Sequence, residues 1–231
     1  MKNPPPRRTE FSRADIPDLT VKVLRAGDGA RPDVRLLDVG GKLLVVKDYA
    51  KGANLTKRAL GRYLVERELA AYTRLRGLRG VPALHGYMDP YALVTQFCDA
   101  QPAPSVPASR LTPDFFARLL ELVRRIHSRG VAHGDLRRLP NVLIDSYDYP
   151  VLVDFTAAVI SGSSPLAALI LPHMFENDLR GIYKLKLRHA PALLTADEEA
   201  FLKQRGLEEK LFRRVRDRVR GPLQRLAGGE P

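Results

Sequence analysis

The chain has 231 residues, of which 45% are hydrophobic, so it can form one two-lobed domain or two small domains with a real core. Its single cysteine, Cys98, excludes an intramolecular disulfide and fits a reducing compartment. Lysine and arginine number 38 against 26 acidic residues, and the net charge of +12 favours polyanionic partners: nucleic acid, an anionic membrane face or phosphorylated substrates.

The sequence shows no pattern of a membrane-targeting segment. The first residues, MKNPPPRRTEF, carry charge and proline but no apolar stretch of the secretory kind. The longest strongly apolar tract, PLAALILP at 165–172, is too short to span a bilayer. We therefore expect a soluble, cytoplasmic protein, with peripheral attachment to the inner face of the inner membrane left open.

The first half of the chain predicts strands around one helix. Residues 21–49 are strand-like and are broken by the turn signals AGDGARPD and VGGK. Residues 56–76 predict a helix, and 91–97 (YALVTQF) predict another strand. Residues 100–109 (AQPAPSVPAS) are the best candidate for a hinge or linker. The apolar positions of the predicted helix are Leu60, Leu64, Ala71 and Leu75.

The second half predicts helices around a small hairpin. A helix is expected to begin after the N-cap Thr112 and to end at Gly130, with an apolar stripe along it. A loop follows at 132–140, and then two short strands, 141–145 (NVLID) and 150–155 (PVLVDF). The remainder is mostly helical and increasingly basic. The stripe residues are Phe116, Leu119, Leu120, Val123, Ile126 and His127.

This segregation of strands and helices predicts an α+β fold in two lobes, with a cleft at the linker. We expect a flexible N-terminal extension at 1–19. A small, nucleotide-binding lobe at 20–99 and a mainly helical lobe at 110–231 would follow. The C-terminal lobe would end in a basic helix. That helix would bury Leu207, Leu211, Val215 and Val219, and would expose Lys210, Arg213, Arg214, Arg216, Arg218 and Arg220.

Two charged residues occupy positions where apolar ones are expected. Lys47 ends the apolar run LLVVK, and Glu68 falls on the apolar stripe of its helix, four residues after Leu64 and three before Ala71. A carboxylate on a core-facing stripe must be paired or protonated, so Lys47 is its natural partner. Glu66 lies about 200° around the helix from Glu68 and is therefore expected to be solvated.

Two further acidic residues and an asparagine fall at the ends of predicted strands. Asp135 lies in AHGDLRRLPNVLID, six residues before Asn141, and Asp154 ends the strand VLVDF. A two-stranded hairpin could bring Asn141 and Asp154 side by side. A carboxylate and an amide oxygen suit Mg²⁺, with water and substrate phosphates as its other ligands.

The ordered set Lys47, Glu68, Asp135, Asn141 and Asp154 resembles a protein-kinase-like fold. The segments VVKDYA, RYLVERELAAYTRLRGLRGVPALHG, GVAHGDLRRLPNVLID, LVDFTAA and NDLRGIYKLK more closely resemble the small bacterial kinases of the lipopolysaccharide core heptose kinase group, relatives of the RIO kinases. The resemblance covers roughly residues 20–190. It implies an enzyme that uses ATP and Mg²⁺ to phosphorylate an alcohol group.

By this resemblance, Lys47 would hold the α- and β-phosphates of ATP, and Glu68 would fix its rotamer. Asp135 would accept the proton of the acceptor hydroxyl or orient it. Asn141 and Asp154 would bind Mg²⁺.

The resemblance also implies two supporting residues. His133 would brace the loop rather than take part in the chemistry. Asp178, in ENDLRG, resembles the helix aspartate that hydrogen-bonds the catalytic-loop backbone of kinases.

The sequence departs from the kinase pattern in several places. No GxGxxG precedes Lys47, and AGDGARPD, with Gly27 and Gly29, is the glycine-bearing turn in its place. The 135–141 loop has one residue more than the usual kinase loop and should bulge. Thr156 replaces the glycine of DFG, and no APE follows. Gly134 stands where many protein kinases carry arginine, which argues against control through a phosphorylated activation loop.

Arg137 and Arg138 follow Asp135 directly, where an acceptor would approach. We expect them to recognise a phosphate or carboxylate on the substrate, although a solvated turn or contacts to ATP are equally compatible. The apolar residues 165–175 could press into a membrane interface, or simply pack against the helical lobe. An anionic glycolipid acceptor and contact with an anionic membrane are therefore expected partners, and no stable nucleic-acid complex is expected.

The residues leave three functions open. The leading prediction is a kinase of a sugar hydroxyl of the lipopolysaccharide core. A RIO-like Ser/Thr protein kinase is the alternative within the same class. The third is a non-catalytic pseudokinase that binds membrane or RNA through its basic surface. The missing glycine-rich loop favours the third, but an intact buried Lys47–Glu68 pair disfavours it, because such pairs contribute little to stability.

Overall fold

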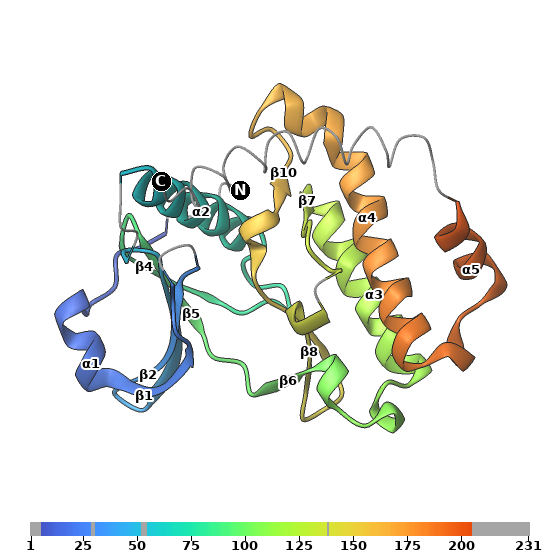
Figure 1. Cartoon of the computed structure of the whole chain (residues 1–231), viewed down its shortest axis with the longest axis horizontal. Helices are drawn as coiled ribbons and strands as arrows, with labels where there is room; N and C mark the ends of the chain where they lie inside the picture. The colour runs from blue at the N-terminus through green and yellow to red at the C-terminus, as the bar shows by residue number, and fades with distance from the viewer. Residues whose placement is uncertain (1–5, 29–30, 52–54, 138, 205–231) are drawn as a thin grey trace, which may run out of the picture.

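The computed structural model describes residues 6–28, 31–51, 55–137 and 139–204. An antiparallel sheet and one long helix form the N-terminal part, and helices with two small sheets form the C-terminal part. Figure 1 shows the sheet and α2 together in one part of the molecule and the helices α3 and α4 in the other, joined through the region of β6 and β8. The predicted α+β arrangement, with strands gathered in the first half, is confirmed.

The N-terminal sheet has five antiparallel strands in the order β1-β2-β3-β5-β4. Gly40 and Gly41 join β2 to β3 with φ angles of 61° and 81°, the left-handed conformations that a tight two-residue hairpin turn requires. The strands are β1 (Thr20–Arg25), β2 (Asp33–Val39), β3 (Lys42–Asp48), β4 (Leu84–Asp89) and β5 (Ala92–Gln96).

The two faces of β3 have different partners. Lys47 lies opposite Val34 of β2 and Leu93 of β5, so these three side chains share one face of the sheet. Leu44 and Val46 point to the other face and are fully buried. The register therefore places the lysine on the face that α2 and the rest of the chain approach.

Residues of the N-terminal segment cover that second face. η1 (Arg13–Asp15) and α1 (Ile16–Leu19) bring Ile16 into a cluster of buried sheet residues, and Phe11 packs beside it. Arg8 forms a parallel bridge with Tyr87. The expected extension at 1–19 is thus part of the packed sheet domain from its first described residues onward. The sheet residues of this cluster are Leu37, Leu44, Val46, Met88, Ala92 and Val94.

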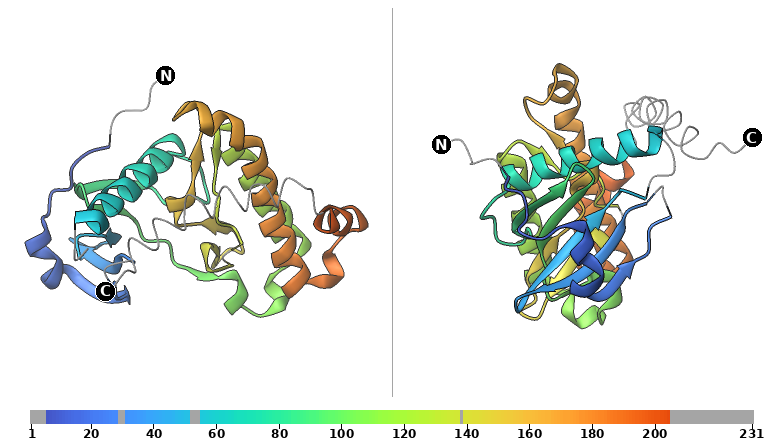
Figure 2. Two further views of the ribbon diagram at one scale, coloured as in Figure 1. Left: turned by 45° about the horizontal axis from the view of Figure 1, so that its top comes forward. Right: turned by 90° about the vertical axis from the view of Figure 1, so that its left-hand side faces the viewer.

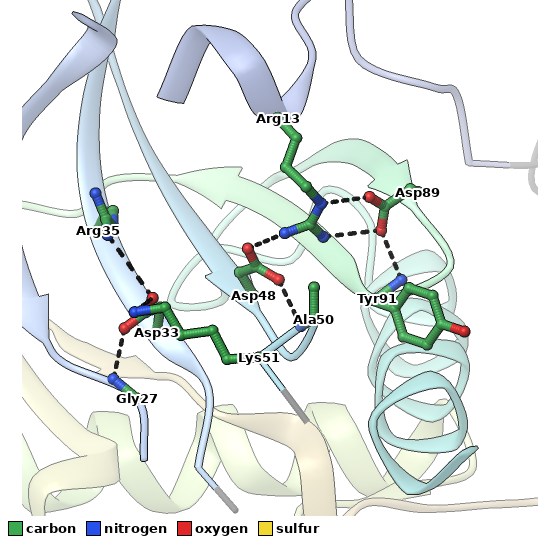
Figure 3. A network of polar contacts seen from close by, with 9 residues as sticks. All are labelled: Arg13, Gly27, Asp33, Arg35, Asp48, Ala50, Lys51, Asp89 and Tyr91. Carbon is green, nitrogen blue, oxygen red and sulfur yellow. Dashed lines mark hydrogen bonds and ion pairs between the residues drawn. The ribbon is translucent and has the colours of Figure 1, made fainter. Parts of the chain in front are cut away.

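Arg13 attaches this segment to two strand ends, as Figure 3 shows. Its Nε donates to Asp89 Oδ2 at 2.8 Å, its Nη2 donates to Asp89 Oδ1 at 3.1 Å, and its Nη1 pairs with Asp48. Burial alone would lower the pKa of Arg13, but the hydrogen bonds to Asp89 and Asp48 raise it above its usual value. At the neighbouring strand end, Asp33 accepts from Gly27 N at 2.5 Å and pairs with Lys51 at 2.6 Å.

Helix α2 (Leu55–Arg74) packs against the sheet through a narrow stripe. Ala71 of the expected stripe is buried, and so is Leu75, just beyond the helix. Leu60 and Leu64 are only half-buried, because Gly61 and Val65, one position further along, face the interior instead. In the first half of the helix, the buried stripe therefore lies one residue further along the chain than predicted. Gly61 allows close approach, since a Cβ there would lie 2.8 Å from the Cβ of Tyr49.

Three helices organise the C-terminal part. The predicted cap of α3 is confirmed, because Thr112 Oγ accepts from Phe115 N at 3.2 Å. The buried face of α3 contains Phe115 and Leu122 in addition to the predicted Phe116. Figure 2 shows α3 and α4 running side by side, with α5 beyond α4. The helices are α3 (Pro113–Ser128), α4 (Pro165–His189) and α5 (Ala196–Lys203).

Two small sheets lie between the helices and the N-terminal part. The predicted hairpin of 141–145 and 150–155 is confirmed as β8 and β9, and Asn141 O accepts from Val153 N at 3.1 Å beside it. The expected linker at 100–109 begins with β6, which pairs with β8, so it is joined to the C-terminal part by hydrogen bonds. The strands are β6 (Ala100–Pro102), β7 (Val131–Ala132), β8 (Val142–Asp145), β9 (Pro150–Leu152) and β10 (Val159–Ile160).

Some expectations cannot be compared with the structure. The basic C-terminal helix expected beyond residue 206 lies outside the described residues, and so does Arg138. Within the described ranges, no helix has the length and apolar character needed to cross a bilayer.

Candidate active site

Lys47 lies between two carboxylates that come from distant parts of the chain. Its Nζ is 2.9 Å from Glu68 Oε2, as the sequence led us to expect, and 2.6 Å from Asp154 Oδ1. Lys47 is 8% exposed and Glu68 only 1%, whereas Glu66 on the opposite side of α2 is exposed. One ammonium group thus joins β3, α2 and the segment after β9.

The charges of this triad depend on one another. Burial alone would lower the pKa of Lys47, but Glu68 and Asp154 raise it, so the lysine stays an ammonium. Burial alone would raise the pKa of Asp154, but Lys47 and the hydroxyl of Thr156 hold it well below its usual range. Burial raises the pKa of Glu68, and Lys47 offsets this only in part. The lowered pKa of Asp154 therefore keeps this carboxylate ionised at neutral pH.

The backbone of Asp154 adopts a left-handed conformation, with φ 66° and ψ 69°. This is uncommon for a residue other than glycine and is found where the surroundings hold it in place. Thr156, which replaces the kinase glycine, donates from Oγ to Asp154 Oδ1 at 2.6 Å. The backbone of Asp154 also hydrogen-bonds the buried Tyr72, and that of Phe155 hydrogen-bonds Glu68. The substituted threonine therefore fixes the orientation of the carboxylate.

The loop that carries Asp135 is held by a buried histidine and a buried aspartate. Asp178 of α4, which is 1% exposed, accepts from the backbone N of His133 at 2.7 Å and of Gly134 at 2.9 Å. His133 lies 3.0 Å from Val153 O through Nε2, and its Nδ1 accepts from Asp135 N at 3.3 Å. Both ring nitrogens are thus engaged, which fits a bracing role.

Two glycines let the loop approach its neighbours. Gly134 has φ +80°, and a Cβ there would overlap the carbonyl oxygen of Ala157. The position that is arginine in many protein kinases therefore has no space for a side chain. Gly181 of α4 faces Leu136, whose Cβ would lie 2.8 Å from an added Cβ. The loop rests directly on α4 because both positions are glycine.

Asn141 closes the loop on itself. Its Nδ2 donates to Asp135 O at 3.0 Å, although the loop is one residue longer than expected for a kinase. A 3-10 turn over Leu139–Asn141 takes up part of this length. Asn141 is 7% exposed and Asp135 half-buried, so the amide is fixed behind the more accessible carboxylate.

The oxygen atoms of Asn141 and Asp154 are of the kind that suits a magnesium ion bound partly through a substrate. With Nδ2 committed to Asp135 O, the remaining polar atom of Asn141 is an oxygen, and Asp154 supplies an ionised carboxylate. No group of three His, Cys, Asp or Glu side chains within the described ranges could hold a metal by itself. Mg²⁺ commonly binds through one or two protein oxygens, phosphate oxygens and water. Asn141 and Asp154 have this character.

Arg137 is half-buried and donates from Nη2 to Asn177 Oδ1 at 3.4 Å. It therefore lies where the Asp135 loop meets α4.

Two residues of the site were not identified from the sequence. Arg67 of α2 donates from Nε to Ala158 O at 2.5 Å and from Nη2 to Ala157 O at 2.8 Å, which ties the helix of Glu68 to the segment after Asp154. His127 of α3, expected only on an apolar stripe, lies 3.0 Å from Asp178 Oδ2 and stacks on Phe175. The sequence carries no signal of the contact of Arg67 with Ala157 and Ala158, because Arg67 is one of several arginines on a basic helix.

The segment between Asp154 and α4 is short. It contains only η5 (Phe155–Ala157), β10 and a turn before α4 begins at Pro165. β10 pairs with β7, immediately before the loop of Asp135. The segment that follows Asp154 therefore leads directly into α4, and through β10 it is paired with the strand that precedes the loop of Asp135.

Among known proteins, the chain is similar to solved structures. No family model and no curated protein matches the sequence. Among solved structures, the chain is similar to the Rio2 kinase from Chaetomium thermophilum, with a TM-score of 0.58 and 21% identity over 91% of this chain and 76% of that one. It is also similar to the same organism's Rio2 kinase–ADP/Mg²⁺–phosphoaspartate complex, with a TM-score of 0.58 and 22% identity over 84% and 65% of the two chains.

The chain has a protein-kinase-like fold. Its β-rich N-terminal part and helical C-terminal part correspond to the two lobes of this fold, as the motifs predicted. The likeness is to RIO kinases, while the narrower resemblance to heptose kinases stays a prediction.

Proposed function

We propose that the protein is an ATP- and Mg²⁺-dependent phosphotransferase with an alcohol group as acceptor. The observation that carries the proposal is the meeting of Lys47, Glu68 and Asp154 within hydrogen-bond distance, beside the loop on which Asn141 holds Asp135. A buried lysine between two carboxylates has a weak rationale in stability alone. It has a clear rationale if the ammonium group and Asp154 serve phosphate and metal.

In this proposal each side chain has one task. Lys47, held by Glu68, directs its ammonium group to the phosphates, and Asp135 accepts or orients the acceptor hydroxyl proton. Asn141 and Asp154 would hold Mg²⁺, which when bound would neutralise charge on the transferred phosphoryl group. His133 and Asp178 keep the loop of Asp135 in one conformation. The chain's own contribution is therefore mostly positioning.

The acceptor is the finer part of the proposal. We propose a sugar hydroxyl of an anionic glycolipid of the lipopolysaccharide-core type, because the motifs resemble heptose kinases and Arg137 lies in the same loop as Asp135. Reversing the charge of Arg137 should raise the KM for such an acceptor, with little effect on nucleotide affinity. An equal loss of both would contradict the assignment.

Thermal unfolding with ATP, in the presence and absence of Mg²⁺, tests the nucleotide site. Ligand at a hundredfold excess over Kd adds about 2.7 kcal/mol, which for a chain of this size raises Tm by roughly 5–10 °C. We expect a Mg²⁺-dependent shift in the wild type that Asp154→Asn abolishes. If neither protein shifts in either condition, the non-catalytic alternative becomes the better explanation.

A RIO-like activity is the second candidate, and the solved neighbours favour it. One neighbour was captured as a phosphoaspartate complex with ADP and Mg²⁺. If this chain acts similarly, incubation with γ-labelled ATP should label the protein itself, and hydroxylamine should remove the label. Loss of this label in Asp135→Asn would place the phosphate on Asp135 or make it depend on that residue. A hydroxyl acceptor kinase without such an intermediate should give no hydroxylamine-labile label.

A further inference from the structure

The first turns of α4 form an uncharged projection from the molecule. Residues 155–175 contain no Asp, Glu, Lys or Arg, in a chain that is 28% charged. Figures 1 and 2 show that α4 begins beyond the ends of β7 and β10, so that its first turns stand out from the body in both views. We call residues 162–169 the α4 tip. Within it, Leu166 is 57% exposed and Leu169 is 78% exposed.

The other side of the same turns is anchored. Ala167 and Leu171 are buried in a small cluster with Ala132 of β7 and Val159 of β10. Ser164 caps the helix, because its Oγ accepts from Ala167 N at 3.0 Å. The tip is therefore a supported helix end with an apolar inner side and an apolar outer side. Core packing explains the inner side and leaves the two outward leucines unexplained.

Three arginines lie together on one side of the base of the tip. Arg74, at the end of α2, donates to Ser161 Oγ at 2.8 Å and to Arg129 O at 2.9 Å, and Arg129 donates to Arg76 O at 2.9 Å. We call Arg74, Arg76 and Arg129 the arginine cluster. Within the described ranges, none of the three pairs with a carboxylate, and Arg74 and Arg76 are exposed. The tip thus projects from a positively charged base.

This combination suits one kind of partner. A leucine pair with cations behind it matches the interface of an anionic bilayer, where apolar side chains enter to about 5–10 Å and arginines meet the headgroups. The first charged residue after the tip, Glu176, comes seven residues after Leu169, about 10 Å along the helix, and would limit the depth. A second copy of the chain would need roughly 800 Å² on each partner, far more than two leucines offer.

The tip also has a fixed position relative to the candidate site. Asp178, which holds the backbone of His133 and Gly134, comes nine residues after Leu169 on the same helix. At 1.5 Å per residue, the two levels of α4 are about 13 Å apart. When the tip is inserted in a bilayer, a lipid headgroup of that bilayer would therefore be within reach of the loop of Asp135.

We propose that the α4 tip and the arginine cluster dock the protein on an anionic lipid bilayer, with Leu166 and Leu169 inserted among the headgroups. Docking itself does not depend on the proposed phosphotransfer. The consequence that the loop of Asp135 faces the headgroups does rest on the proposed function, and it identifies the acceptor as membrane-bound.

The absence of tryptophan from the chain allows a direct test. Leu169→Trp introduces a single indole at the tip, and Leu187→Trp is its control, because Leu187 is 48% exposed at the far end of the same helix. Both variants are titrated with vesicles of phosphatidylcholine, with and without phosphatidylglycerol. We expect a blue shift and quenching by brominated lipid for Leu169→Trp with anionic vesicles, and neither change for Leu187→Trp.

Sedimentation with the same vesicles gives the magnitude. Leu166→Ser/Leu169→Ser should lower the partition constant by about tenfold or more, and Arg76→Gln by about fivefold, while Leu187→Ser leaves it unchanged. The ATP-dependent shift in Tm, measured on the same variants, should stay as in the wild type and reports on the proposed function separately. No binding to anionic vesicles, or binding with unchanged Leu169→Trp emission, would overturn the proposal.

Discussion

The position of Lys47 between two carboxylates makes a specific prediction about stability. In Lys47→Met, Glu68 and Asp154 lose the only ammonium group that contacts both in the described structure. Removing one partner of a buried ion pair costs about 3–5 kcal/mol, because the remaining charge is left uncompensated. In Glu68→Gln the lysine keeps Asp154 at 2.6 Å, so the cost should be about 1.5–3 kcal/mol, the range for a hydrogen bond to a charged group.

A double variant makes the test sharper. In the wild type, Asp154→Asn should destabilise, because it removes a carboxylate that Lys47 stabilises. In the Lys47→Met background the same change should stabilise, because it removes one of two uncompensated carboxylates. The sign of the effect therefore reverses. Arg62→Met is the control on the same helix: its pair with Glu66 is exposed on both sides, so the substitution should leave the free energy of unfolding nearly unchanged.

The pH dependence has a definite sign. In the wild type, Asp154 has a lowered pKa, so its contribution is complete above the unfolded value and is lost only as pH falls toward its folded value. Burial raises the pKa of Glu68, and without Lys47 the main influence that opposes this rise would be lost. The deficit of Lys47→Met should thus shrink as the pH is lowered toward the ordinary pKa of a glutamate, because Glu68 then takes up a proton in the folded state.

Urea unfolding followed by far-ultraviolet circular dichroism measures these differences in a chain that has no tryptophan. A deficit of Lys47→Met that does not change with pH would refute the reasoning, and so would an Asp154→Asn effect of the same sign in both backgrounds. Either result would mean that the ammonium group does not hold both carboxylates.

Three further predictions concern single residues. In urea unfolding, Gly134→Ala should destabilise the protein by about 1–3 kcal/mol more than Gly77→Ala. Both glycines have positive φ, but of the two only Gly134 has a carbonyl oxygen where the added Cβ would lie. Equal losses of stability would contradict this reasoning. Burial raises the pKa of Cys98, so its alkylation by iodoacetamide should be slower than that of a free thiol at pH 7–8 and should accelerate only at higher pH; a rate equal to that of the free thiol would show that burial has no such effect. Arg67→Met should lower the rate of phosphoryl transfer by roughly tenfold with little change in nucleotide Kd, whereas Arg62→Met should change neither; a change confined to Kd would argue against a positioning role.

The contact of Lys47 with Glu68 could be predicted because both charges interrupt apolar patterns. Such an interruption requires a partner, and the sequence offered one on the neighbouring element. The cap at Thr112 and the hairpin of β8 and β9 were predictable for a similar reason, since each depends on local residues. The contact of Lys47 with Asp154 had no such signal, because it joins residues 107 positions apart.

Other features escaped prediction because the residues have an ordinary explanation on a surface. Arg67 reads as one more solvated arginine, and its contact with the carbonyls of Ala157 and Ala158 exists only once η5 is placed. Leu60 and Leu64 fit the pattern of core residues, but α2 approaches Tyr49 through Gly61, and Val65 is buried instead. In both cases the tertiary position of a neighbouring segment decided the outcome, and periodicity could not report it.

The covering of the sheet by Ile16 and Arg13 has a consequence for the order in which the chain folds. Ile16 belongs to the same buried cluster as Met88 and Val94, and Arg13 bridges to Asp89, so this segment needs partners that emerge from the ribosome more than seventy residues later. Closing a loop of that length is slow compared with forming α2. Until β4 and β5 leave the ribosome, Leu37, Leu44 and Val46 lack their cover, and the nascent chain would be open to chaperone binding during that interval.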